Sequence, residues 1–216
     1  MKKIGKSTFE FEKPIFVMGG FSLVGEKEAE GPFGKYFSES LRDDTLGQNT
    51  FEKAEREMHS LVIKKLMQQQ KLSDSDIDIL ISGDLMNQLV TSNFSAREFD
   101  IPFLGVYSAC SSFTEALVIA STFLSSGAAK KIIAVAGSHF SSAERQYRNP
   151  LEFGNQRQTY SQWTVTGMGA TLLTCVGGSA SPVIKRVTIG KVTDWGIVDI
   201  ANMGAAMAPV IAIIGP

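Results

Sequence analysis

The chain has 216 residues, 44% of them hydrophobic and 20% charged, and its 21 basic and 22 acidic residues give a formal net charge of −1. A nucleic-acid-binding protein needs a surplus of Lys and Arg to contact phosphates, so this balance argues against a nucleic-acid partner. The hydrophobic fraction is too high for a disordered chain and sufficient for one large domain or two small ones.

The first third of the chain contains one short predicted strand and one long predicted helix. Residues 14–18 form an apolar run that Gly19 and Gly20 are expected to close, and residues 21–48 read as a long irregular segment. Apolar residues then recur at three- and four-residue spacing from Phe51 to Leu66, which predicts one face of an amphipathic helix. Asn49, with Glu52 three positions on, is its predicted cap. His59 lies within this helix, where a packing or surface role is expected.

The rest of the chain alternates between predicted strands and helices. Ser112 and Glu115 are placed to form a capping box, and Gly127 to end the same helix. Alternation of this kind predicts an α/β protein with a mixed sheet buried on both faces. The predicted strands are residues 77–82, 102–106, 131–136, 168–176 and 183–192, and the predicted helices are residues 92–99 and 112–126.

The residue types that bind metals or cofactors are few. Cys110 and Cys175 form no C-x-x-C pair and the chain has two histidines, so we predict no metal site, and a reducing intracellular compartment fits. Gly167-Met168-Gly169 is a lone G-x-G without the surrounding dinucleotide fingerprint, and there is no P-loop, so we predict no cofactor. The basic N-terminus has no apolar run behind it, so no signal peptide is predicted. The uncharged stretch 158–184 is rich in Gly, Ser and Thr, so no transmembrane helix is predicted.

Cys110 has the most informative position in the sequence. It lies between a predicted buried strand and the predicted helix 112–126. Backbone N–H groups and the positive end of a helix dipole favour the thiolate, which is the nucleophilic form of cysteine. The alternative is a small buried side chain, a common role for free cysteine.

Three further residues are candidates near the strand ends. His139 follows the strand 131–136, and ligands of open α/β sheets bind beyond the carboxyl ends of the strands, so His139 is expected to share a pocket with Cys110. Arg145 and Arg148 are three residues apart and suit carboxylates if they face the same way. The alternatives are an ordinary loop histidine and a solvated pair of arginines.

These motifs carry a family resemblance. The sequence strand–Ala109-Cys110-Ser111-Ser112–helix, followed by a buried strand and the glycine-rich residues 165–170, resembles the first half of the thiolase-like fold, with the third ketoacyl synthase family nearest among enzymes. The chain more closely resembles the stage V sporulation protein AD family. That closer resemblance is carried by residues 83–88, 101–105, 109–111, 143–146, 163–167 and 202–209.

The resemblance implies a function in sporulation. Members of this family bind dipicolinic acid, a pyridine with two carboxylates, and help to deliver it into the developing spore together with membrane proteins of the same operon. It further implies a homodimer in the full-length form and a soluble protein inside the sporulating cell, or one peripherally associated with the spore inner membrane. The expected ligand-binding residues are Cys110, Ser111, His139, Arg145, Arg148, Thr166 and Gly167.

The sequence departs from the ketoacyl synthase pattern in two respects. Thr166 stands where these enzymes usually carry the acidic residue of G-D-G-A-G-A. The fold consists of two similar halves, and we expect residues 1–180 to form the first half and residues 181–216 only the start of a second, truncated half. The catalytic His and Asn of the condensing enzymes come from that second half. The alternative function, an acyltransferase or condensing enzyme with Cys110 as nucleophile, would therefore lack its partner groups here.

Overall fold

The computed structural model describes residues 1–147, 164–198, 204, 205 and 207. Its strands are β1 (Lys2–Lys3), β2 (Thr8–Val24), β3 (Glu39–Ser40), β4 (Ile79–Gly83), β5 (Phe103–Gly105), β6 (Lys131–Ser138), β7 (Gly167–Thr174) and β8 (Val183–Thr188). Its α-helices are α1 (Glu26–Ala29), α2 (Phe51–Gln70), α3 (Val90–Ala96), α4 (Ser112–Ser126) and α5 (Phe140–Tyr147). Short 3₁₀ turns lie at Gly34–Tyr36, Asp74–Asp76, Asn87–Leu89 and Ala109–Ser111.

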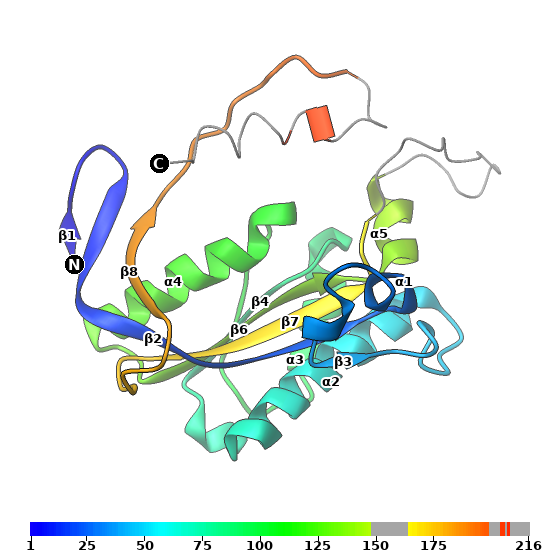
Figure 1. Cartoon of the computed structure of the whole chain (residues 1–216), viewed down its shortest axis with the longest axis horizontal. Helices are drawn as coiled ribbons and strands as arrows, with labels where there is room; N and C mark the ends of the chain where they lie inside the picture. Colours follow the sequence, from blue (N-terminus) through cyan, green and yellow to red (C-terminus); the bar gives the residue numbers. More distant parts are fainter. Residues whose placement is uncertain (148–163, 199–203, 206, 208–216) are drawn as a thin grey trace.

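One mixed sheet runs through the described part of the chain, in the order β1-β2-β7-β6-β4-β5, with β3 and β8 paired to β2. Strands β4, β5 and β6 are parallel, whereas β7 is antiparallel to both β6 and β2. Helices α2 and α3 cover one face of the sheet and α4 covers the other (Figure 1). The α/β prediction with a mixed buried sheet is confirmed.

Strand β6 shows why the sheet is buried on both faces. Ile133 and Val135 belong to the hydrophobic cluster under α2, whereas Ile132 and Ala134 belong to the cluster under α4, and all four side chains are fully buried. Because successive side chains of a strand point to opposite faces, an apolar run without alternation supplies both clusters.

The first strand is much longer than predicted. Gly19 and Gly20 do not close it: β2 continues from Thr8 to Val24, with a register shift in its pairing to β7 between Val17 and Gly19. The glycines remain in the ladder because β7 pairs with the strand on both sides of them. A partner distant in sequence thus overrides a local breaker signal.

The helix ends agree with the sequence in part. Helix α4 spans the predicted residues 112–126 and ends at Gly127, whose φ of 78° is the left-handed conformation expected of a glycine cap. The predicted capping box at its start is absent, because the Ser112 hydroxyl donates to the Ala109 carbonyl oxygen instead, at 2.8 Å. At the start of α2 the cap is Thr50, which accepts from the Lys53 N–H, and not the predicted Asn49.

Candidate functional site

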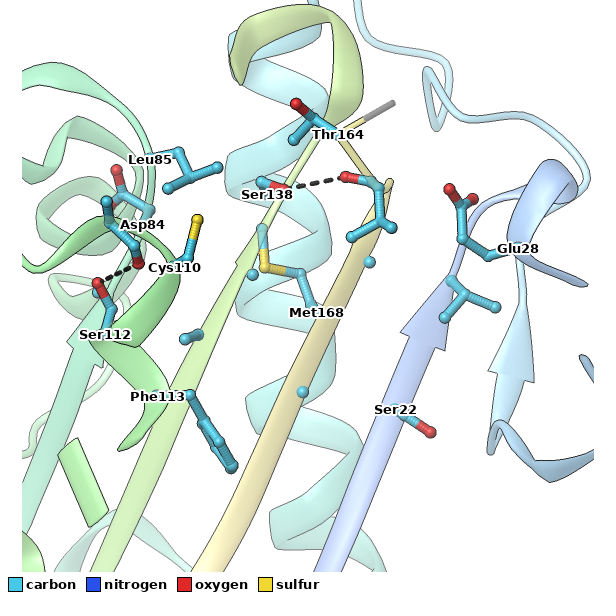
Figure 2. A pocket seen from close by; sticks show the side chains of 18 of the residues that line it. Ser22, Glu28, Asp84, Leu85, Cys110, Ser112, Phe113, Ser138, Thr164 and Met168 are labelled. Atoms are coloured by element: carbon cyan, nitrogen blue, oxygen red, sulfur yellow. Dashed lines mark hydrogen bonds between the residues drawn. The ribbon is translucent and has the colours of Figure 1, made fainter. Parts of the chain in front are cut away.

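A cavity of about 790 Å³ opens where β4 and β6 end, β7 begins and the chain enters α4. Volumes of this size are typical of small-molecule sites. Its described wall is mostly apolar or glycine, with Leu85, Phe113 and Met168 among the larger side chains. Cys110 and Asp84 lie on one side of the cavity, and Ser22 and Glu28 on the other (Figure 2).

Cys110 lines this cavity from the 3₁₀ turn that immediately precedes α4, and its side chain is exposed. The thiol therefore lies at the N-terminus of a 15-residue helix, where backbone N–H groups favour a negatively charged ligand. This is the strand–turn–helix position that the sequence predicted. The arrangement is suited to holding an anion or to presenting a nucleophile.

The turn that carries Cys110 is held by close backbone packing. A Cβ atom on Gly83 would lie 2.6 Å from the carbonyl oxygen of Val106 and 2.8 Å from the Cβ of Ser112, so only glycine lets β4 end so close to α4. Ser111, a predicted ligand residue, uses its hydroxyl to donate to the Ser108 carbonyl oxygen at 2.8 Å. We therefore assign Ser111 to the support of the turn.

Two carboxyl groups lie in the described wall of the cavity, and this part of the wall contains no Arg or Lys. Asp84 is only 1% exposed, and it accepts hydrogen bonds from the N–H groups of Met86 and Ser92 at 2.8 and 2.7 Å. Burial raises the pKa of Asp84. Glu28, on the opposite side, accepts from the N–H of Thr166 at 3.1 Å.

His139 lies close in sequence to the cavity but turns away from it. Its ring stacks on Phe51, with 5.1 Å between the ring centroids, and its Nε2 lies 3.1 Å from the carbonyl oxygen of Asp44. Nδ1 accepts the Ser141 N–H, so Nε2 carries the proton of a neutral ring, and burial lowers the pKa of His139. The structure therefore does not bring His139 and Cys110 into one pocket: Ser138 lines the cavity and His139 does not.

Arg145 also lies apart from the cavity. Its Nη1 is 2.8 Å from Glu52 Oε1, its guanidinium lies over the Phe51 ring, and it lines a separate, smaller cavity of about 210 Å³. Arg148 lies outside the described residues. The expectation that both arginines face a carboxylate ligand thus has no support from Arg145, which already has a carboxylate partner.

Thr166 and Gly167 have different roles. Gly167 lines the cavity, whereas Thr166 is 2% exposed and its hydroxyl oxygen accepts the N–H of Phe140 at 3.1 Å. That bond ties the start of β7 to the first turn of α5. In the described structure Thr166 therefore supports the wall from behind.

One buried residue behind the wall did not figure among the predicted site residues. The carboxylate of Glu55, on α2, is fully buried and accepts hydrogen bonds from the His139 N–H at 3.0 Å, the Thr91 hydroxyl at 2.9 Å and the Ser142 hydroxyl. Its sequence position held a signal: Glu55 is four residues after Phe51 and three before Met58, on the apolar face of the helix. An acidic residue on that face must have buried partners.

Comparison with known proteins decides the family. The family model described as stage V sporulation protein AD matches residues 5–214. The Bacillus subtilis (strain 168) protein named "Stage V sporulation protein AD" is 41% identical over 212 residues, which cover 98% of this chain and 62% of that protein. The chain belongs to the stage V sporulation protein AD family. It spans 62% of the length of this curated relative.

Solved structures show the fold of this family member. The 3-oxoacyl-[acyl-carrier-protein] synthase III from Aquifex aeolicus VF5 superposes with a TM-score of 0.51 at 19% identity, covering 74% of this chain and 53% of that one. The priming β-ketosynthase of the R1128 polyketide pathway gives 0.51 at 14% identity, covering 77% and 51%. The fold is therefore thiolase-like, as the sequence predicted.

The remaining histidine and cysteine of this family member are structural. His59 is fully buried, with its two ring nitrogens 2.5 Å from Ser82 Oγ and 2.6 Å from Ser95 Oγ, and burial lowers its pKa to about 4. Cys175 donates to the Leu124 carbonyl oxygen at 3.3 Å, and burial raises its pKa. Of the packing and surface roles expected of His59, the structure shows the packing role.

The described residues contain neither a cluster of potential metal ligands nor a helix that could span a membrane. In residues 1–147 and 164–198, no three His, Cys, Asp or Glu side chains come together as metal ligands. Each helix in the same part of the chain is too short or too polar to cross a bilayer.

Proposed function

We propose that this chain serves sporulation by binding dipicolinic acid in the Cys110 cavity, and that it supports the uptake of this ligand into the developing spore. As a full-length protein it would act as a homodimer, with membrane proteins of the same sporulation operon as partners. Membership of the stage V sporulation protein AD family supports the proposed function in sporulation. The position of Cys110, facing a cavity at the N-terminus of α4, supports the site.

The cavity offers complementary groups for part of this ligand. One carboxylate placed beside Cys110 would meet the positive end of the α4 dipole. The flat pyridine ring would pack against Phe113 and Met168, both in the cavity wall. The second carboxylate would face a described wall whose charged groups are the acids Asp84 and Glu28, so its binding requires a further compensation.

A second candidate function follows from the apolar wall. An acyltransferase or condensing enzyme of ketoacyl synthase type, with Cys110 as nucleophile, would use a largely apolar cavity for its acyl chain. Such an enzyme also needs a general base near the nucleophile. In the described structure His139 does not take that role, because its ring faces Asp44. We therefore rank ligand binding first.

The Cys110→Asp variant tests the binding site. A carboxylate set beside the ligand should repel it by several kcal/mol at an effective dielectric constant near 20, so calorimetry should show affinity for dipicolinate reduced by at least roughly tenfold. Cys110→Ser, which is similar in size and neutral, should bind within a few-fold of the parent. Arg145→Gln should bind like the parent, because Arg145 is paired with Glu52 outside the cavity.

Equal affinity in the parent and in Cys110→Asp would contradict the site. The enzyme alternative is tested in parallel by mass spectrometry after incubation with an acyl thioester and a malonyl thioester. Repeated turnover to a condensed product would favour the enzyme, whereas a single acyl group on Cys110 without turnover would not.

A further inference from the structure

Two buried carboxyl groups, Asp84 in the cavity wall and Glu55 behind it, accept hydrogen bonds from consecutive residues of α3. Thr91 and Ser92 are consecutive residues of α3: the Thr91 hydroxyl donates to Glu55 Oε1 at 2.9 Å, and the Ser92 N–H donates to Asp84 Oδ2 at 2.7 Å. Asp84 lines the cavity, and Glu55 lies behind it on α2. A charge placed in the cavity therefore acts first on Asp84 and through it on Glu55.

The pair retains a proton near neutral pH. Burial is the largest cause that raises the pKa of Glu55 to about 7, and the negative charge of Asp84 contributes in the same direction. Because the charge of Asp84 acts on Glu55, a change of charge at Asp84 changes the proton affinity of Glu55.

Burial is the main cause that raises the pKa of Glu55, and Asp84 is the charged group whose charge adds to it. Helix α3 has no charged residue, and the β6 and β7 residues under α2 are apolar. On α2 itself His59 is neutral, since its pKa is about 4, and Glu52 is paired with Arg145 of α5. From the side of α5, the pKa of His139 is lowered and Glu144 accepts from Thr164. The neighbouring ionisable residues on α2 are Lys53, Arg56 and Glu57.

The hydrogen-bond network accommodates Glu55 in both protonation states. When Glu55 is ionised, Ser142 donates to its Oε2. When Glu55 is protonated, Oε2–H donates to Ser142 Oγ, and the Ser142 hydroxyl donates to the His139 carbonyl oxygen, which lies 3.0 Å away. A proton can therefore be added without leaving a buried donor or acceptor unpaired.

We propose that the Asp84–Glu55 pair couples ligand binding to a proton: a carboxylate enters the cavity beside Asp84 together with one proton, which is taken from solvent and held by the pair. The inference rests on the proposed function, since it concerns an anionic ligand of the same cavity. It supplies the compensation that the second carboxylate requires on an acidic wall. The pair thereby selects carboxylate ligands according to the ambient pH.

Proton coupling has a measurable pH dependence. At pH values below the midpoint at which the ligand-free Asp84–Glu55 pair is half protonated, the proton is already bound. The affinity for dipicolinate should then be independent of pH. Above that midpoint affinity should fall by up to about tenfold per pH unit, because each bound ligand must recruit a proton. This decrease in affinity should continue up to the pH at which the pair is half protonated in the dipicolinate complex.

Calorimetric titration of dipicolinate near pH 7, in two buffers of different ionisation enthalpy, measures the protons taken up per ligand. We expect uptake of a sizeable fraction of one proton by the parent chain and almost none by Glu55→Gln, in which a neutral amide of the same shape can still accept from Thr91. The matched control is Glu57→Gln on the same helix, which should take up as many protons as the parent. Binding without proton uptake in the parent, or equal uptake in Glu55→Gln, would overturn the inference.

A ligand-free measurement separates this inference from the proposed function. The side-chain carboxyl carbon of Glu55, followed by carbon-13 NMR and assigned with Glu55→Gln, should titrate near pH 7. If dipicolinate gives no binding heat, the proposed function fails, and the NMR titration still decides whether the pair holds a proton. A titration midpoint of Glu55 at the ordinary value for glutamate would show that the pair holds no proton near neutral pH and would overturn the inference. Circular dichroism of Glu55→Gln confirms that the variant is folded.

Discussion

Replacing Gly137 with alanine should destabilise the protein by roughly 3 kcal/mol, the upper part of the range for overpacking a buried site. Gly137 lies in β6 opposite Met168 of β7, and a Cβ atom there would overlap the carbonyl oxygen of Gly167 and lie 2.7 Å from the Cα of Met168. Backbone atoms cannot move aside as a flexible side chain does, so β6 and β7 would have to separate. Urea unfolding followed by circular dichroism measures the loss.

Gly169→Ala is the matched control. Gly169 is in β7, pairs with Ala136 of β6 and lines the same cavity, yet a Cβ atom built on it meets nothing within 4 Å. Its free energy of unfolding should stay within about 0.5 kcal/mol of the parent, as expected for a substitution without a steric conflict. Equal losses in the two variants would show that the close approach of β7 to Gly137 is not what limits this position.

The pH dependence of stability should contain two large and opposite contributions. The pKa of Glu55 is about 7 in the folded protein against an ordinary 4.5, so between these values the native state holds a proton that the unfolded chain has released. The free energy of unfolding therefore falls as pH rises through that window. The pKa of His59 is about 4 against 6.5, so the unfolded chain holds the extra proton and the free energy rises with pH. Each contribution amounts to roughly 3 kcal/mol.

Single variants should separate the two contributions. Relative to the parent, Glu55→Gln should gain stability as pH rises from about 4.5 to 7, because the falling contribution is removed. His59→Gln should lose stability relative to the parent as pH rises from about 4 to 6.5. Urea unfolding across this range gives both difference curves. A flat curve for either buried residue would contradict the pKa given for it.

The sequence predicted the elements whose signals are local. The continuous apolar run of β6 indicated burial on both faces, and Gly127 marked the end of α4 because the left-handed conformation there favours glycine. The extension of β2 through Gly19 and Gly20 was not predictable in this way, because it depends on pairing with β7, which lies far along the chain.

The site residues likewise differ in whether local sequence signals could place them. A strand–turn–helix pattern sufficed to place Cys110, since its position is set by the elements on either side. For His139 the pattern gave the strand end but not the direction of the ring, which follows from its contacts with Phe51 and Asp44. For Glu55 the apolar face of the helix indicated burial, but its donors, the Thr91 and Ser142 hydroxyls and the His139 N–H, are distant in sequence and were not predictable.

The pairing of β2 with β7 also constrains the order of folding. Residues 16–24 find their partners in residues 167–174, whereas the parallel strands β4, β5 and β6 lie within one continuous stretch with α3 and α4. Closing so large a loop costs chain entropy before any contact compensates it, and contacts of high sequence separation slow folding. During synthesis β2 leaves the ribosome long before β7 exists. Its apolar residues therefore remain without this neighbouring strand until β7 has been synthesised.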